Sequence, residues 1–187
     1  MARRIYLVVS WGFVILTLIS IFLVLRKPSH FPVQTTPEAA KSFDRKLQEV
    51  ESKSEQGVRK EVRISETELN SKLVESIQGA AGMPSGPAAL KAAEVHLKGD
   101  TFASVLTVHV GGRDVYVTLG GKLGTNNHEL QFSATEVRMG SLPVPMSLVE
   151  PVLRKKLNSP EMRDQLKLPE SIAEVRIEDG ELVIQSK

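Results

Sequence analysis

The residues best suited to acid–base or metal chemistry in this sequence are its histidines, which are scattered along the chain. They are His30, His96, His109 and His128. A zinc site of the His-Glu-x-x-His type needs a second histidine four residues after the first, and Phe132 stands four residues after His128. His96 and His109 could be neighbours across a predicted hairpin, but no third ligand is in view. We therefore interpret the histidines as polar surface residues and expect no metal.

Motifs for nucleophilic catalysis or phosphate binding are missing as well. The sequence contains no cysteine and no Gly-x-Ser-x-Gly turn. Residues 120–124 (Gly-Gly-Lys-Leu-Gly) have glycines at the wrong spacing for a phosphate-binding loop, and they join two predicted strands. The sequence thus predicts a protein that is not an enzyme and needs no cofactor. Three titratable side chains converging in one cleft would reopen that question.

The charge of the chain is nearly balanced, at 24 basic and 22 acidic residues. Four of the basic residues and none of the acidic ones lie in the first 27 positions, so the remainder has a net charge of −2. A nucleic-acid-binding domain needs a basic surface that displaces counterions from phosphates. The composition therefore predicts that nucleic acid is not a partner.

Residues 5–25 are an uncharged, apolar stretch that predicts a membrane span. As a helix it would rise roughly 31 Å, about the thickness of the hydrocarbon core of a bilayer. The alternative is a cleaved signal peptide, which has a shorter apolar core and a small-residue cleavage site, whereas Arg26, Lys27 and Pro28 follow here. We expect residues 1–27 to be a retained single-pass anchor in the cell membrane. Two arginines in the short N-terminal tail favour an extracytoplasmic position for the rest.

Residues 28–57 are expected to form a linker and then a helix. Three prolines by position 37 favour an extended spacer as far as Thr36. Thr36 and Pro37 suit the N-cap and the first position of a helix, and apolar residues then recur at helical spacing up to Gly57. The pattern leaves open whether this helix is a stalk or packs against the soluble domain of residues 58–187.

Residues 94–138 predict four β-strands in series. Apolar and polar residues alternate along each run, which gives every strand one apolar and one polar face. Turns that contain glycine separate the runs. We expect an antiparallel meander with one solvated face and one apolar face.

Two amphipathic helices are predicted on either side of the meander in sequence. Residues 65–68 and 147–150 both fit the capping box that starts a helix. Residues 79–89, rich in glycine and proline, are either a plain connector or a lip beside a cavity. A short strand precedes the first helix, and a hairpin ends the pattern. The predicted fold class is α+β, a curved antiparallel β-sheet with two amphipathic helices across its apolar face, plus the N-terminal transmembrane helix.

The space between the sheet and the two helices is the candidate site. Few aromatic residues are available to fill it, so its aliphatic side chains either close a core or line a groove that suits an acyl chain. The residues expected to line the groove are Leu73, Ile77, Leu106, Val108, Val115, Val117, Leu130, Phe132, Val149 and Leu153. The residues expected at its rim are Leu142, Val144 and Met146.

The pattern alone does not decide between a groove and a filled core. With a groove, the protein binds a lipid or another long apolar molecule. With a filled core, it is a membrane-tethered scaffold of the cell envelope, and a partner protein binds a sheet edge or the helix at residues 37–55.

Three motifs within residues 58–185 resemble those of a known family. They are Ile64-Ser65 with Leu69-Asn70, then Gly140-Ser141-Leu142-Pro143-Val144-Pro145, then Leu168-Pro169-Glu170-Ser171-Ile172. In order and spacing they are similar to the motifs of YpmS-type bacterial envelope proteins and LmeA-type phospholipid-binding proteins. The resemblance implies a small membrane-tethered lipid-binding domain of the tubular-lipid-binding kind, in which a long curved sheet wraps a helix and opens to an apolar groove. It implies no catalytic residues. Such lipid binders are often secreted with a cleaved signal, whereas this N-terminus is expected to be retained.

Overall fold

The computed structural model describes residues 19–20, 22–24, 26, 33–55, 59–79 and 88–187. Most of the predicted membrane span at residues 5–25 lies outside these ranges, as does most of the predicted loop at residues 79–89. Within the described ranges, no helix combines the length and the apolar character needed to cross a membrane.

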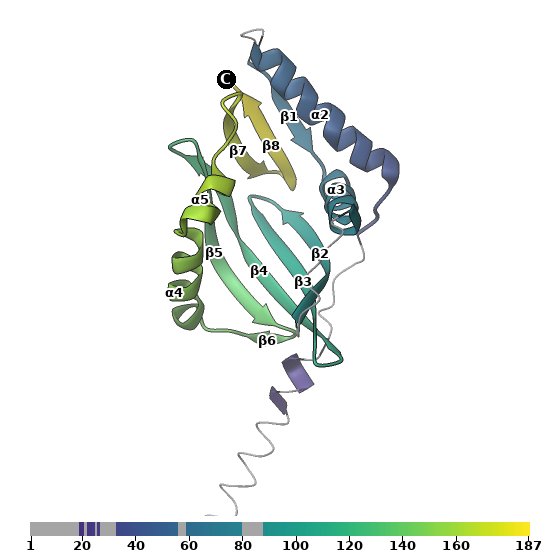
Figure 1. Ribbon diagram of the computed structural model, residues 1–187, viewed down its shortest axis with the longest axis vertical. Coiled ribbons are helices and arrows are strands. Elements are labelled where there is room, and N and C mark those ends of the chain that lie inside the picture. Colours follow the sequence, from purple (N-terminus) through teal and green to yellow (C-terminus); the bar gives the residue numbers. More distant parts are fainter. Residues whose placement is uncertain (1–18, 21, 25, 27–32, 56–58, 80–87) are drawn as a thin grey trace, which may run out of the picture.

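The described chain is an α+β fold built on two antiparallel sheets (Figure 1). The larger sheet has its strands in chain order, β2 (Ala88–Lys98), β3 (Thr101–Val110), β4 (Arg113–Asn126), β5 (Glu129–Met139) and β6 (Leu142–Pro143). The smaller sheet has the order β1 (Glu61–Ile64), β8 (Glu181–Ser186) and β7 (Ile172–Glu178). The helices are α2 (Pro37–Glu55), α3 (Glu66–Gly79), α4 (Met146–Leu157) and α5 (Pro160–Leu166). The predicted α+β class with an antiparallel sheet is confirmed.

The predicted meander corresponds to β2–β5, although β2 begins six residues before the predicted start. The β3–β4 turn has Gly111 and Gly112 at φ +56° and +80°, where glycine meets no steric penalty. The predicted C-terminal hairpin is β7–β8. The sequence did not indicate, however, that this hairpin pairs with β1 in a separate sheet.

The cluster of buried side chains that pack together lies at the smaller sheet, and Ala93, Val105 and Val137 are buried in the larger sheet. The cluster's fully or almost fully buried side chains come from α2, β1, β7 and β8, at Val50, Val62, Ile64, Ile172, Val175 and Ile184. Leu123 and Leu130, from the β4–β5 end of the larger sheet, pack against this cluster. The cluster therefore closes only one end of the larger sheet.

Helix α2 packs against the domain and is not a free stalk. Val50 is fully buried, and Ala40 is buried as well. Helix α2 is joined to α3 by ion pairs from Lys46 to Glu68 (2.7 Å) and from Lys72 to Asp44 (2.8 Å). Thr36 is its N-cap, since the hydroxyl oxygen of Thr36 accepts a hydrogen bond from the Ala39 N–H at 3.1 Å. The question that the sequence left open is thus answered for the described residues.

Helix α3 starts with the predicted capping box. The Ser65 hydroxyl accepts from the Glu68 N–H (3.3 Å), and the Glu68 carboxylate accepts from the Ser65 N–H (2.9 Å). Burial raises the pKa of Glu68, but hydrogen bonds from Lys46, Ser42 and Ser65 outweigh it and lower the pKa to about 2. The carboxylate therefore stays ionised although it is almost completely buried.

The start of α4 differs from the prediction. The predicted capping box at residues 147–150 is wrong, because α4 begins at Met146 after Pro145 and has no side-chain cap. Helix α5 was not predicted at all, although Ser159-Pro160 is a start signal: the Ser159 hydroxyl accepts from the Met162 N–H at 3.4 Å.

Candidate functional site

The apolar face of the larger sheet carries all six strand residues of the predicted groove. Leu106 pairs with Val117, and Val108 pairs with Val115. Farther along β4, Phe132 pairs with Leu123 and Leu130 pairs with Thr125. Directly opposed residues in an antiparallel sheet point to the same face, so these side chains form one continuous surface. We call it the apolar face.

All thirteen residues of the predicted groove and rim are half-buried. None of them is among the buried residues, although Leu130 packs against the buried cluster at the smaller sheet. Side chains that closed a filled core would be almost fully buried. The apolar face is therefore partly covered by described residues and partly open to solvent.

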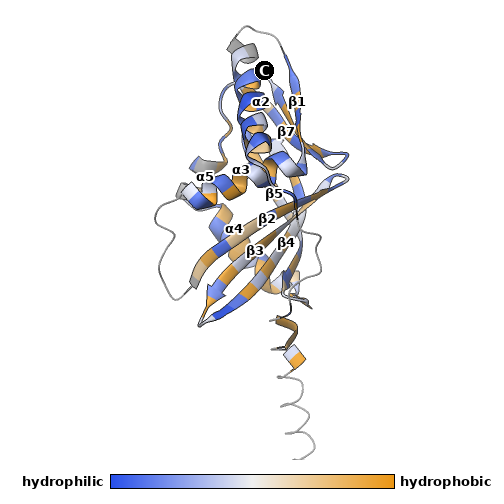
Figure 2. Ribbon diagram, turned by 90° about the vertical axis from the view of Figure 1, so that its right-hand side faces the viewer, coloured by the Kyte–Doolittle hydropathy of each residue, from blue (hydrophilic) through white to orange (hydrophobic). Residues whose placement is uncertain are grey.

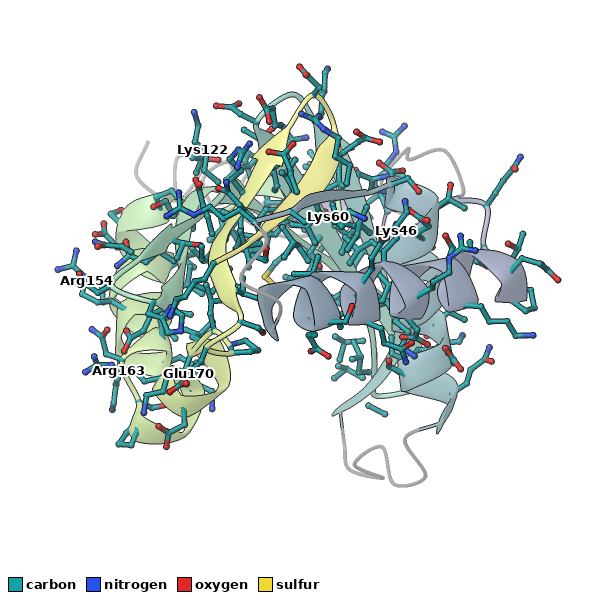
Figure 3. The ribbon with its side chains drawn as sticks, turned by 90° about the horizontal axis from the view of Figure 1, so that it is seen from above. Lys46, Lys60, Lys122, Arg154, Arg163 and Glu170 are labelled. Atoms are coloured by element: carbon teal, nitrogen blue, oxygen red, sulfur yellow. The ribbon has the colours of Figure 1, made fainter. Side chains whose placement is uncertain are left out.

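Helices α3 and α4 flank the apolar face at opposite edges and do not lie across its middle. Helix α3 packs on β2 and α4 packs on β5. Viewed from above, α4 and α5 lie on one side and α2 and α3 on the other, with β7 and β8 in the foreground between them and the larger sheet farther back (Figure 3). The predicted helix residues divide accordingly, with Leu73 and Ile77 on α3 and Val149 and Leu153 on α4.

Asn70 holds α3 against the edge of the sheet. Its side-chain amide donates to the Val95 carbonyl oxygen (2.6 Å), and its side-chain oxygen accepts from the Val95 N–H (2.7 Å). The Glu66 carboxylate accepts a hydrogen bond from the Leu97 N–H at 2.8 Å. Leu97 lies two residues after Val95 on β2, so its backbone N–H points to the same edge of the sheet. These side chains satisfy part of the edge of β2 as a neighbouring strand would. Sequence reasoning did not identify Asn70 as a structural residue, although it closes the first resemblance motif.

Helix α4 leaves an open cavity beneath it. None of its described residues is buried, and a cavity of about 460 Å³ that opens to solvent lies between α4 and β5. The cavity brings together the predicted residues Phe132, Leu153 and Met146. A second cavity of about 420 Å³ shares Phe132 and Leu157 with the first and is also lined by Leu130. Both volumes fall in the range of roughly 300–1,000 Å³ that is usual for ligand pockets.

The edges of these cavities carry ion pairs rather than free charges. Glu150 pairs with Arg154 at 2.6 Å beside the first cavity, and Glu129 pairs with Arg163 at 3.3 Å beside the second. The lining of both cavities therefore mixes apolar side chains with polar and charged ones, which suits an amphiphilic ligand.

An aromatic pair that the sequence did not indicate closes one end of the apolar face. The rings of Phe102 and Phe132 lie 5.2 Å apart at a tilt of 46°. A Cβ at Gly121 would come within 2.5 Å of the Phe132 ring and 2.4 Å of the Ser133 carbonyl oxygen. The glycine therefore makes room for the Phe132 ring, and it pairs across the strands with Phe102 and Ala134.

A further cavity of about 550 Å³ lies between the start of α2 and the end of α3. Its lining includes Ala40, Val74 and Gln78. None of the predicted groove residues lines it, so it is separate from the apolar face.

The two histidines of the predicted meander that were considered as metal ligands lie apart in the structure. His96 pairs across the hairpin with Ala103 and His109 pairs with Ala89, so the two histidines are not the neighbours that the sequence suggested. His109 and Lys91 both contact Asp114, at 2.7 and 2.8 Å, and they lower the pKa of that carboxyl. No group of three or more metal-ligating side chains occurs among the described residues.

Comparison of the chain with protein-family models, with curated proteins and with solved structures found no match.

Proposed function

We propose that this protein is a membrane-anchored, non-enzymatic domain of the bacterial cell envelope that binds a lipid or another long apolar molecule. The ligand lies against the apolar face of the larger sheet, in the groove between α3 and α4. Residues 5–25 anchor the domain in the cell membrane as a single span, with the domain on the extracytoplasmic side.

One observation carries the proposal: the thirteen groove and rim residues are all half-buried, and of these only Leu130 packs against the buried cluster at the smaller sheet. A soluble protein that leaves a broad, continuous apolar surface partly open usually covers it with a ligand or a partner. An acyl chain suits this surface, because each CH₂ group removed from water contributes about 0.8 kcal/mol. The resemblance to YpmS-type and LmeA-type proteins points to the same class of ligand.

The proposal predicts that lipid remains bound to residues 28–187 when they are purified without the apolar segment. Native mass spectra should show an adduct of a few hundred daltons, and organic extraction should identify the lipid. Val117→Arg places a charge in the middle of the apolar face and should abolish the adduct, as should Leu106→Glu.

Thr107→Arg is the matched control for Val117→Arg. Thr107 pairs with Tyr116, next to Val117 on β4, and its side chain points to the opposite face. The control should keep the adduct. A wild-type protein that stays free of lipid after incubation with liposomes, or a Val117→Arg protein that is folded and still loaded, would refute the proposal.

A second candidate function is favoured by the outer face of α4. Leu148 and Val152 are 68% and 67% exposed there, and a partner protein of the envelope could cover them. The protein would then be a membrane-tethered scaffold. Two results together would favour this function over lipid binding. The wild-type protein would stay free of lipid after incubation with liposomes, and the Val152→Glu variant would no longer bind a partner protein that the wild type binds.

A further inference from the structure

One end of the apolar face has a solvent-exposed apolar rim. Val110, the last residue of β3, is 43% exposed, and Met139, the last residue of β5, is 39% exposed. Met139 pairs with Val117 and with Leu142, so this rim continues the apolar face without a break. The β3–β4 turn and the β5–β6 turn lie at this same end of the sheet (Figure 1). We call the rim formed by Val110, Met139 and Leu142 the open end.

The described residues of the apolar N-terminal segment contact the sheet at the open end. The Ser141 N–H donates to the Leu23 carbonyl oxygen at 2.8 Å. Gly140 has φ +59°, and a Cβ there would lie 2.3 Å from the Val24 carbonyl oxygen. The segment therefore sits on the β5–β6 turn at a position that only glycine permits. Figure 2 shows its apolar residues directly below this end of the sheet.

The described residues of this segment carry exposed apolar side chains. Phe22 is 67% exposed and Ile19 is 50% exposed, and residues 5–18 carry no charge in the sequence. Apolar side chains that no described residue covers are compatible with the hydrocarbon of a bilayer. Arg113, the first residue of β4 and the pairing partner of Val110, is exposed and makes no ion pair with any described residue, so it is available to an anionic lipid headgroup.

We propose that the open end is the portal through which lipid acyl chains pass between the bilayer and the apolar face. The contact between Leu23 and Ser141 holds the portal at the surface of the membrane that carries the anchor. A chain then moves from hydrocarbon to the apolar face without crossing water. This inference rests on the proposed lipid-binding function and on the proposed membrane span.

The test uses the full chain in nanodiscs of phosphatidylethanolamine and phosphatidylglycerol. A phosphatidylglycerol with a photoactivatable group near the end of one acyl chain is delivered to the nanodiscs, and samples are irradiated at successive times. Crosslinked peptides from β3 and β4 then report the rate at which the apolar face is loaded and the final occupancy.

Val110→Glu and Met139→Glu should each slow loading on the order of fivefold and leave the final occupancy unchanged, since a carboxylate near an interface hinders but does not block an acyl chain. Val152→Glu is the matched control: the same change at a more exposed apolar residue, on α4 and away from the open end. It should load at the wild-type rate. If both portal variants also load at the wild-type rate, the portal is refuted and lipid binding is not.

A second pair of variants tests the contact with the N-terminal segment. Gly140→Ala should slow loading, because the new methyl group collides with the Leu23 and Val24 carbonyl oxygens. Gly99→Ala is the control, because it imposes a similar backbone strain at φ +58° but has no atom within 4 Å of the new methyl group. This variant should load lipid at the wild-type rate. Equal rates for the two variants would overturn the role of this contact. A wild-type chain that never crosslinks on β3 or β4 would instead refute the proposed function itself.

Discussion

Replacing Asn70 tests whether α3 is fixed to the sheet in the way that forms one side of the groove. Asn70 is 1% exposed and makes two hydrogen bonds with the backbone of Val95 and one with the carbonyl of Glu66. Asn70→Ala leaves the Val95 N–H and carbonyl without their partner. An unpaired buried group costs about 1–3 kcal/mol, so we expect a loss of about 3 kcal/mol in the free energy of unfolding.

Asn70→Asp gives the same test a pH dependence. The Val95 carbonyl oxygen lies 2.6 Å from the amide nitrogen that the new carboxyl oxygen replaces, so the carboxyl must keep a proton to donate there. Its pKa in the folded state is then raised above its unfolded value of about 3.9. Stability is full below that pH and falls as pH rises, by about 1.4 kcal/mol per pH unit, or up to about 4 kcal/mol between pH 4 and pH 7.

Urea unfolding of the full chain in a non-ionic detergent, followed by circular dichroism, measures these differences. Wild type, Asn70→Ala and Asn70→Asp are compared at pH 4, 5.5 and 7, and each variant is referred to wild type at the same pH. Asn70→Ala should show a deficit that does not change with pH. If the loss of stability in Asn70→Asp is also independent of pH, the expectation that the new carboxyl donates its proton to the Val95 carbonyl oxygen is refuted.

Two further substitutions test other buried polar contacts. Glu68 has a pKa of about 2 against an ordinary 4.5, so its contribution is full above about pH 4.5 and lost as pH falls towards 2. Glu68→Gln should therefore lower the free energy of unfolding by about 3 kcal/mol at pH 7 and by progressively less below pH 4.5. Urea titrations at each pH measure this difference. The control is Glu75→Gln at an exposed residue, which should cost under about 0.5 kcal/mol. The Thr125 hydroxyl donates to the Val175 carbonyl (3.1 Å) and accepts from its N–H (2.8 Å), and thereby joins the two sheets. Thr125→Val should lower the midpoint of thermal unfolding by a change equivalent to about 1–3 kcal/mol, and an unchanged midpoint would contradict this link.

Local signals in the sequence predicted the individual elements well. Strict alternation predicted the meander, because the two faces of a strand differ only in alternate side chains. Ser65 and Glu68 predicted the start of α3, because both capping partners are within four residues of each other. At α4 the same pattern failed: Pro145 precedes the first helical residue, and the helix begins without help from the Ser147 hydroxyl.

The assembly of the elements was not visible in the sequence. Alternation shows that Leu106 and Val117 share a face, but it carries no information on what covers that face. The division of the strands between two sheets depends on β1 pairing with β8, and no local pattern encodes a partner so distant in sequence. For the same reason the sequence left the packing of α2 undecided, whereas Val50 is completely buried.

The pairing of β1 with β8 also determines when this domain can fold. Lys60 donates its N–H to the hydroxyl of Ser186, 126 positions later, and accepts from the N–H of Ser186 at 2.8 Å. Closing a loop of that length costs about 2 kcal/mol more in chain entropy than closing a ten-residue turn. A nascent chain cannot assemble the core cluster until residues 172–186 have been synthesised, because β7 and β8 supply Ile172, Val175 and Ile184.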